Sequence, residues 1–223
     1  MMTDYTMTEQ SRVRRLPKRG AYDKATIHAI VDATLICHVG FVQDEQPFVM
    51  PTLHARRGDE ILLHGSSASR MLQHALTGAS LCITMTLIDG LVLARSAFHH
   101  SVNYRSAVLF GCARPIPESE KIEALKHFTE RLVPERWDDV RAPTAQELKG
   151  TTIVAVPIDT ASAKVRTGPP IDDDEDYALS VWAGVLPLQQ QFLTPQADPK
   201  LRAGVDLPAY LTNFLQQQHM KGD

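Results

Sequence analysis

Apolar residues alternate with polar ones along much of this chain, and the alternation predicts a series of short β-strands. Strand-like runs occupy residues 35–42, 47–55, 60–65, 81–94, 104–113, 151–159 and 162–168. The first of these runs are joined by short polar turns, which is the pattern of an antiparallel meander. A meander that continues into further strands favours a closed or partly closed barrel. We therefore expect a mainly β fold, an antiparallel β-barrel with flanking helices.

Helical spacing of apolar residues appears in segments that flank these strands. Asp23 is a good N-cap for a helix up to Thr34, and Ser119 begins a longer amphipathic segment. A further helix should follow His64, and a short one is expected over residues 207–220. There is no internal repeat and no linker between two domains. We expect a basic N-terminal arm, one barrel domain and a tail with a short helix, at residues 1–20, 21–188 and 189–223.

Composition and charge narrow the class of protein. The chain has 223 residues, 43% of them hydrophobic, and a net charge of -3, so it lacks the basic excess of a nucleic-acid-binding domain. No apolar run approaches the roughly 18 residues that span a bilayer, so we expect no membrane segment. The N-terminus has no apolar signal core, which predicts a cytoplasmic protein. Cys37, Cys82 and Cys112 lie in apolar runs and are interpreted as small buried hydrophobic residues.

Two segments carry the polar chemistry expected of a ligand site. Ser66, Ser67 and Ser69 lie where a strand ends and a helix begins, followed by Arg70. The start of a helix offers free N–H groups to an anion, and an arginine one turn in can bind it as well. A simpler interpretation is that a serine only caps the helix. The second segment, residues 95–111, contains polar and ring side chains at Ser96, His99, His100, Ser101, Asn103, Tyr104 and Arg105.

The second segment joins two predicted strands, and its mixture of donors and rings suits a cleft for an aromatic ligand that carries an anion. A solvated loop is the simpler alternative. The arm, with Arg12, Arg14 and Arg15, is either a mobile terminus or a cover over an anion, and the acidic run 171–176 is interpreted as a solvated loop. Zinc-site spacings, the serine-hydrolase GxSxG motif and the dinucleotide motif GxGxxG are all absent from the sequence.

A family resemblance becomes specific when segments are taken together. The sequence contains, in order, RVRRLPKRGAYD, ICHVGFV, QPFVMPT, LHGSSASR, LVLARSAFHHSVNYRSAVLFG, ELKGT, AKVRTGPPIDDDEDY and VWAGVLPL. This series, over residues 12–188, resembles the flavin-nucleotide-binding branch of the pyridoxamine 5′-phosphate oxidase-like superfamily. The resemblance implies an FMN-binding split β-barrel that forms a homodimer with FMN at the subunit interface. Relatives include pyridoxamine 5′-phosphate oxidases, nitroimidazole-resistance proteins and some haem-degrading enzymes.

The resemblance also implies which residues form the site. The FMN phosphate would be bound by Gly65, Ser66, Ser67, Ser69 and Arg70. The flavin would lie along Met50, Pro51 and Thr52, with its other edge against Thr84, Met85 and Thr86. The pocket would be closed by Asn103, Tyr104 and Arg105, and by Trp182 from the partner subunit. His64 would lie beside the flavin, as a histidine does in nitroimidazole-resistance relatives, and is the candidate catalytic residue.

The implied activity is that of an FMN-dependent oxidoreductase acting on a small molecule, similar to pyridoxamine 5′-phosphate oxidases or nitroreductases. The loops with which pyridoxamine 5′-phosphate oxidases hold the substrate phosphate are not recognisable here. One alternative is a non-enzymatic flavin carrier or sensor, whose site would leave no space for a substrate. Another is a haem-binding relative, with His64, His99 or His100 as the axial ligand.

Overall fold

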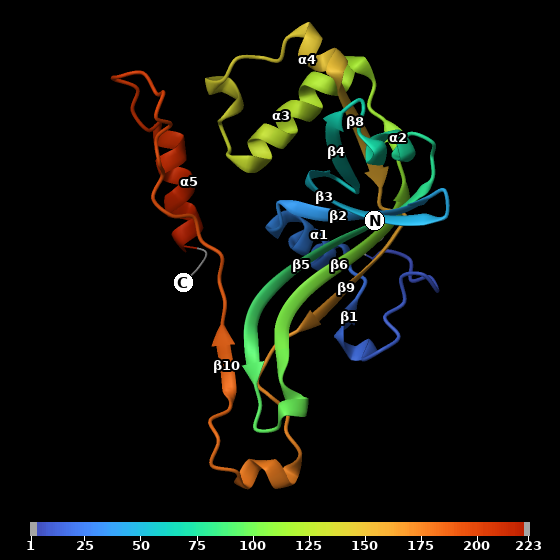
Figure 1. The fold of residues 1–223 in the computed structure, drawn as a ribbon, viewed down its shortest axis with the longest axis vertical. Coiled ribbons are helices and arrows are strands. Elements are labelled where there is room, and N and C mark those ends of the chain that lie inside the picture. Colours follow the sequence, from blue (N-terminus) through green and yellow to red (C-terminus); the bar gives the residue numbers. More distant parts are fainter. Residues whose placement is uncertain (1–3, 221–223) are drawn as a thin grey trace.

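The computed structural model describes residues 4–220, which form an antiparallel β-sheet wrapped into a barrel with helices against it (Figure 1). The sheet has ten strands in the order β1-β9-β6-β5-β2-β3-β4-β8-β7, and β10 pairs with β5. The strands are β1 (Gly20–Ala21), β2 (Ile36–Gln43), β3 (Gln46–Arg57), β4 (Glu60–Ser66), β5 (Ser80–Leu93), β6 (Ser101–Cys112), β7 (Arg114–Pro115), β8 (Thr151–Pro157), β9 (Thr160–Arg166) and β10 (Gly184–Pro187). The mainly β, antiparallel barrel expected from the sequence is confirmed.

The helices α1 (Lys24–Ala33), α2 (Arg70–Ala75), α3 (Lys121–Leu132) and α4 (Ala145–Gly150) lie against the sheet, whereas α5 (Ala209–Met220) lies apart from it in the tail (Figure 1). The helices expected after Asp23, after His64, after Ser119 and over residues 207–220 are present as α1, α2, α3 and α5. The side chain of Asp23 accepts a hydrogen bond from the Thr26 backbone N–H at 2.8 Å, and thereby caps α1. None of the helices in residues 4–220 is long and apolar enough to cross a membrane.

Two apolar clusters hold the barrel together. The larger one fills the interior with residues from α1, α2 and the central strands, including Ile30, Leu63 and Ile83. The second lies between α3 and the outer side of β3, β4 and β8, where Phe128 packs with Leu62. Each cluster uses alternate residues of β4, because successive side chains of a strand point to opposite faces.

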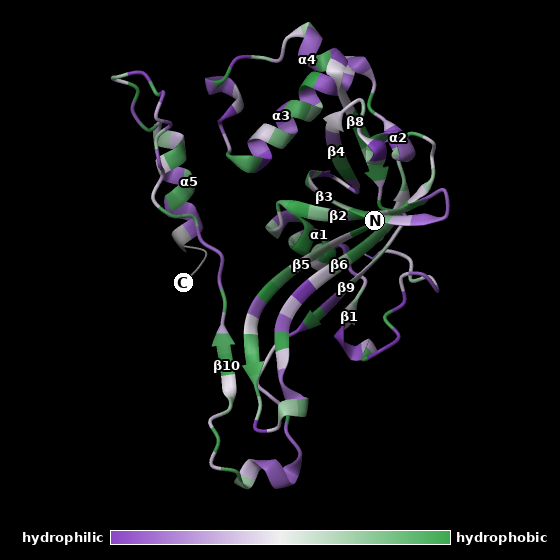
Figure 2. Cartoon of the chain, in the orientation of Figure 1, coloured by the Kyte–Doolittle hydropathy of each residue, from purple (hydrophilic) through white to green (hydrophobic). Residues whose placement is uncertain are grey.

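Strands β5 and β6 extend well beyond the barrel as a long two-stranded extension, with β10 beside β5 (Figure 1). Figure 2 shows β10 and the far end of β5 as hydrophobic, whereas η5 (Asp174–Ala178) at the tip is mostly hydrophilic. The sequence suggested that the acidic run is a solvated loop, but the structure buries one of its carboxylates. The carboxylate of Asp172 is fully covered and accepts hydrogen bonds from the backbone N–H of Arg95 and from its guanidinium, both at 3.0 Å. These bonds attach the acidic segment to the end of β5.

The N-terminal arm is packed against the barrel and is not a loose terminus. Tyr5 is buried in the larger core cluster, and its hydroxyl lies 2.9 Å from a carboxylate oxygen of Asp59 and 2.8 Å from Nε2 of His28. Further along the arm, the backbone N–H of Val13 donates to the hydroxyl of Tyr22 at 2.9 Å. The arm therefore has a defined place beside β1 and β9.

The cysteine prediction holds for only part of the set. Cys37 is buried, and burial raises the pKa of its thiol to about 12. Cys82 is half-buried on the outer face of β5, and Cys112 is exposed. The prediction that all of them are buried is wrong for Cys112, because it is the last residue of β6 and projects away from the core.

We expect Tyr5→Ala to lower the free energy of unfolding by about 3 kcal/mol, the typical cost of truncating a buried aromatic side chain. The arm should also detach, so trypsin should cleave after Arg12, Arg14 and Arg15 faster than in the wild type. Thr6→Ala, at an exposed neighbouring position, is the control and should change neither quantity. Unchanged tryptic cleavage in Tyr5→Ala would contradict the anchoring role of Tyr5.

A second prediction concerns pH. His54 is fully buried, with Nε2 3.1 Å from the Val31 carbonyl, and burial lowers its pKa; burial also lowers the pKa of His28. Below about pH 6.5 the unfolded chain binds protons that the folded chain does not, so stability falls as pH falls, by up to about 1.4 kcal/mol per pH unit for each such histidine. Denaturant midpoints between pH 7.5 and 5 should show this fall. The denaturant midpoint should fall less steeply with falling pH in His54→Gln than in the wild type. Equal slopes would mean that His54 does not contribute to the pH dependence of stability.

Candidate functional site

The turn between β4 and α2 is held by backbone hydrogen bonds that leave its hydroxyl groups at the surface. The N–H of Ser69 donates to the carbonyl of Ser66 at 2.9 Å, and the N–H of Ser67 donates to the carbonyl of Gly150 at 3.0 Å. Ser69 is the N-cap residue of α2, but its side chain makes no capping bond. The simpler interpretation, in which this serine only caps the helix, therefore does not apply to Ser69. Gly65 precedes the turn, and a Cβ at this position would lie 3.2 Å from Cδ1 of Leu72.

Arg70 places the positive charge of this turn next to an aromatic ring. Its guanidinium lies 4.8 Å from the ring centroid of Phe48, a cation–π arrangement. Within residues 4–220 no carboxylate forms an ion pair with Arg70, and the residue is exposed. The guanidinium is therefore oriented by stacking, and its hydrogen-bond donors have no carboxylate partner within the described residues.

The predicted flavin-facing segment of β3 lies at the surface next to β2. Met50 is 44% exposed, and Pro51 and Thr52 follow it along the strand. Pro51 pairs with His38 of β2, which in turn pairs with Thr84 of β5. Directly paired residues of neighbouring strands share a face of the sheet, so Pro51 and Thr84 belong to one continuous surface. Met50 and Thr52 lie on the opposite face of β3, because they pair with the buried residues Val39 and Cys37.

We call this surface the outer face. The flavin-binding residues that were predicted on β5 do not all lie on it. Thr84 and Thr86 lie on the outer face, whereas Met85 points into the core and is 1% exposed. Thr84 pairs with Val108 and Thr86 pairs with Ser106. Because of the strand alternation, Met85 does not share a surface with the two threonines.

The residues predicted to close the pocket also lie on both faces of the sheet, and only Tyr104 is on the outer face. Arg105 donates to both carboxylate oxygens of Asp89, with distances of 3.0 Å from Nε and 2.7 Å from Nη2, and this bonding raises its pKa. Asn103 is buried and accepts a hydrogen bond from Arg166. Tyr104 pairs with Arg166 across the ladder and lies on the outer face. Arg105 and Asn103 are thus already bonded within the chain.

His64 lies on the opposite side of β4 from the barrel interior, under α3. Its ring centroid is 4.3 Å from that of Phe128. Nδ1 is buried and has no hydrogen-bond partner within the described residues. Burial lowers the pKa of His64, so the neutral imidazole is favoured at neutral pH. A buried nitrogen without a partner costs free energy, and a bound group that pairs with it would recover that cost.

Trp182 is remote from these residues within one chain. It is 68% exposed and its ring lies against Gly184, the first residue of β10, which pairs with Leu93 at the far end of β5. His99 is at the same end, with Nε2 3.2 Å from a carboxylate oxygen of Asp173, and the ligand atoms of His99, Asp173 and Asp176 lie within 4.8 Å of one another. The structure therefore does not bring Trp182, His99 or His100 to the serine turn of the same chain.

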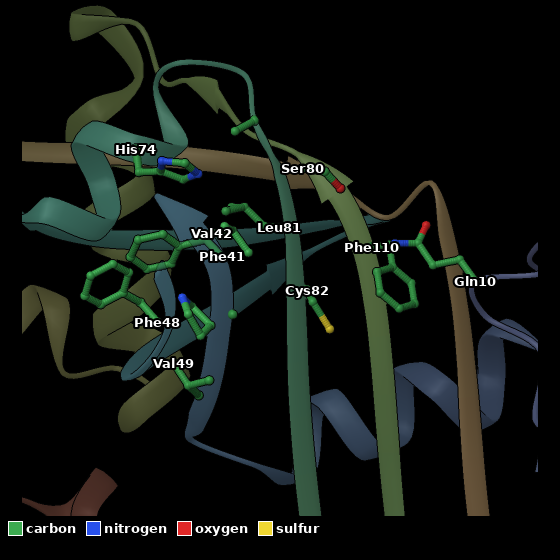
Figure 3. A pocket seen from close by; sticks show the side chains of 13 residues that line it. Gln10, Phe41, Val42, Phe48, Val49, His74, Ser80, Leu81, Cys82 and Phe110 are labelled. Carbon is green, nitrogen blue, oxygen red and sulfur yellow. The ribbon is translucent and has the colours of Figure 1, made fainter. Parts of the chain in front are cut away.

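The sequence analysis did not identify a pocket of about 490 Å³ that has aromatic side chains in its wall and is lined by residues of β2, β3, α2, β5 and β6 (Figure 3). Phe41 stacks on Phe48 with a centroid distance of 5.3 Å, and on His74 at 4.8 Å. Leu81, Cys82 and Phe110 line the other side. A sequence pattern could have identified this pocket. Phe41 and Phe48 lie at equal distances along the chain from the turn between β2 and β3, so they become cross-strand neighbours.

Comparisons with known proteins agree with this architecture. The model of the pyridoxamine 5′-phosphate oxidase family matches residues 23–165. The chain is similar to the flavocytochrome Anf3 from Azotobacter vinelandii, with 41% identity, a TM-score of 0.88 and coverage of 92% of this chain and 96% of that one. No curated protein matches the sequence.

Two further solved structures are similar. The FAD and haem binding protein from Mycobacterium smegmatis is 36% identical, with a TM-score of 0.85 and coverage of 88% of this chain and 97% of that one. A 5-nitroimidazole antibiotic resistance protein from Bacteroides thetaiotaomicron is 25% identical, with a TM-score of 0.54 and coverage of 66% and 86%. The family match and the high identity over nearly the full length lead to one conclusion: the chain belongs to the pyridoxamine 5′-phosphate oxidase-like family.

Proposed function

We propose that the protein is a flavin-dependent oxidoreductase that acts on a small molecule. The observation that carries the proposal is the unpaired Arg70 beside the serine turn, stacked on Phe48, which alternates to the same face of β3 as Met50 and Thr52. A phosphate at the turn and a flat ring along β3 would use these two features together. The FAD and haem binding protein, which is 36% identical, supports a flavin as the ligand.

The turn fits a phosphate in charge and in donors. Ser66, Ser67 and Ser69 offer hydroxyl groups, and the first turn of α2 offers backbone N–H groups. Arg70 adds charge-assisted donors, which are the strongest hydrogen bonds that proteins make to phosphate. FMN carries one such terminal phosphate, and we propose this turn as its site.

Oxidoreductase activity is favoured over a carrier role by the aromatic pocket. Phe48 forms its wall and also stacks on Arg70, so the pocket borders the proposed flavin site. A carrier would need no such space. A pocket of about 490 Å³ with Phe41, Phe48 and His74 in its wall suits a flat apolar substrate. The flavin would supply the redox chemistry, and the protein would supply position and electrostatics.

Haem is a second candidate group, and a specific observation favours it. His64 presents a neutral imidazole with a buried, unpartnered nitrogen in an apolar site against Phe128. A neutral imidazole is the form that binds iron. Two similar structures are described as a flavocytochrome and as an FAD and haem binding protein. His64 is therefore proposed either as an axial ligand or as the residue that hydrogen-bonds the reacting substrate.

The proposed function is tested by the absorption spectrum of the purified protein, with mass spectrometry of the released cofactor. Flavin bands are expected, and a Soret band would show haem in addition. Arg70→Ala should weaken FMN binding by roughly 1.5–3 kcal/mol, the usual worth of a charge-assisted hydrogen bond, and leave riboflavin binding unchanged. Arg202→Ala, an exposed arginine of the tail, is the control. Equal losses for both ligands would make Arg70 structural, and a protein that binds no flavin would refute the proposal.

We further propose a homodimer in which the partner subunit supplies Trp182 to the flavin. The segment 171–188, which contains β10, exposes Ile171, Tyr177, Leu179, Val181, Trp182, Leu186 and Leu188. Contiguous exposed apolar side chains of this kind mark an interface.

Trp182→Ala should weaken the dimer by about 2 kcal/mol or more, as for a tryptophan at the centre of an interface, and should lower flavin retention. Light scattering across a dilution series measures the first effect and the flavin-to-protein absorbance ratio measures the second. Leu201→Ala, an exposed apolar residue outside this segment, is the control. A wild-type monomer that retains flavin would contradict the shared site.

A further inference from the structure

A cluster of metal-ligating side chains lies at the far end of the β5–β6 extension, where η5 meets the short helix η2 (Ala97–His99) (Figure 1). Nε2 of His99 and carboxylate oxygens of Asp173 and Asp176 lie within 4.8 Å of one another. His99 and Asp173 are 74 residues apart in the sequence, so no motif with a short spacing marks the cluster. It forms only when the fold brings one imidazole next to two carboxylates.

The 3₁₀ geometry of η5 places the two carboxylates on one side of the turn. Asp173 is the N-cap residue of η5, and the backbone N–H of Asp176 donates to its carbonyl at 2.9 Å. Side chains three residues apart eclipse one another in a 3₁₀-helix, so these two carboxylates face the same way. The side chain of Asp173 makes no capping bond. One of its carboxylate oxygens lies instead 3.2 Å from Nε2 of His99.

The two short helices are held together by bonds that do not use the three ligand atoms. The covered carboxylate of Asp172 accepts hydrogen bonds from the backbone N–H groups of Arg95 at 3.0 Å and of Ser96 at 3.5 Å, and from the Arg95 guanidinium at 3.0 Å. Ser96 is in turn the N-cap residue of η2, and its hydroxyl accepts from the N–H of Phe98 at 3.2 Å. The ligand atoms are therefore positioned before any ion binds, which lowers the cost of binding.

The distances within the cluster fit a single ion. Ligand atoms that are each about 2.1 Å from a metal lie about 3.0 Å apart when adjacent in an octahedral shell, and about 4.2 Å apart when opposite. The 3.2 Å between His99 and Asp173 is close to the adjacent value. Small side-chain rotations bring the whole set, which lies within 4.8 Å, to these distances. The side chain of Asp173 is 81% exposed, so water can complete the shell.

The negative charge at this end of the extension is not balanced within the chain. Residues 173–176 are four consecutive acids, and in the part of the chain that the structure describes none of them forms an ion pair with a lysine or an arginine. The arginine beside them, Arg95, is already paired with Asp172. Adjacent like charges repel one another, and a divalent cation bound by two of these carboxylates would reduce that repulsion.

We propose that His99, Asp173 and Asp176 bind one divalent metal ion. One imidazole and two carboxylates suit Zn²⁺ or Mn²⁺. The ion would join η5 to the connection between β5 and β6, and would thereby fix the start of the segment that carries Trp182. The proposal is independent of the proposed flavin function, because none of the three ligands belongs to the Ser66–Arg70 turn or to β3.

The test titrates the chelator-treated, full-length protein with Mn²⁺ and follows free Mn²⁺ by electron paramagnetic resonance. One ion should bind per chain, and Zn²⁺ should displace it, because such sites bind Zn²⁺ more tightly than Mn²⁺. His99→Ala and Asp176→Asn should each weaken binding at least about tenfold, since loss of even an outer partner of a metal ligand costs that much. The control is Asp174→Asn, which removes the same charge from an exposed neighbour outside the cluster and should bind as the wild type does. Circular dichroism checks that each variant folds.

Hydrogen–deuterium exchange locates the ion. Zn²⁺ should add protection in residues 95–100 and 172–178 of the wild type, and should add none there in His99→Ala. Failure of both ions to bind the wild type would overturn the proposal. A loss of affinity in Asp174→Asn as large as in Asp176→Asn would also overturn it, because the ion would then be held by diffuse negative charge. Protection confined to other parts of the chain would place the ion elsewhere and would refute this site.

Discussion

The alternation of side chains along the paired strands β3, β2, β5, β6 and β9 determines both the core and the candidate ligand surface. Ile83 and Met85 on β5 fill the barrel interior, and this commits Thr84 and Thr86 to the opposite face. Interstrand pairing then aligns these threonines with residues of neighbouring strands. A slip of one residue in any pair would exchange the two faces, so burial of the apolar set keeps the polar set in register.

The N-terminal arm depends on the same sheet for its place. Tyr5 enters the core and bonds to Asp59, which lies in the turn between β3 and β4. The arginines that follow are thereby held over β6 and β9. A segment that is polar in sequence has a defined place on the sheet because Tyr5 anchors it and because the backbone N–H of Val13 donates to the hydroxyl of Tyr22.

The sequence predicted local features well because they depend on neighbours in the chain. Strand alternation, the helix cap at Asp23 and the serine turn before Arg70 all have local causes. What it could not predict was which side chains meet across strands. The pairing of Arg105 with Asp89 and the burial of Asp172 follow from register and tertiary packing. The N-terminal arm lies against β9, more than a hundred residues later, and no local pattern marks such a contact.

The central claim is that the Ser66–Arg70 turn and the adjacent segment of β3 bind the flavin. Hydrogen–deuterium exchange of the protein with and without saturating FMN tests it most directly, because exchange reports protection along the whole backbone. The account predicts added protection in residues 66–70 and in 48–52, with little change in α5. Protection confined to the tip of the β5–β6 extension, or absent from the serine turn, would contradict it.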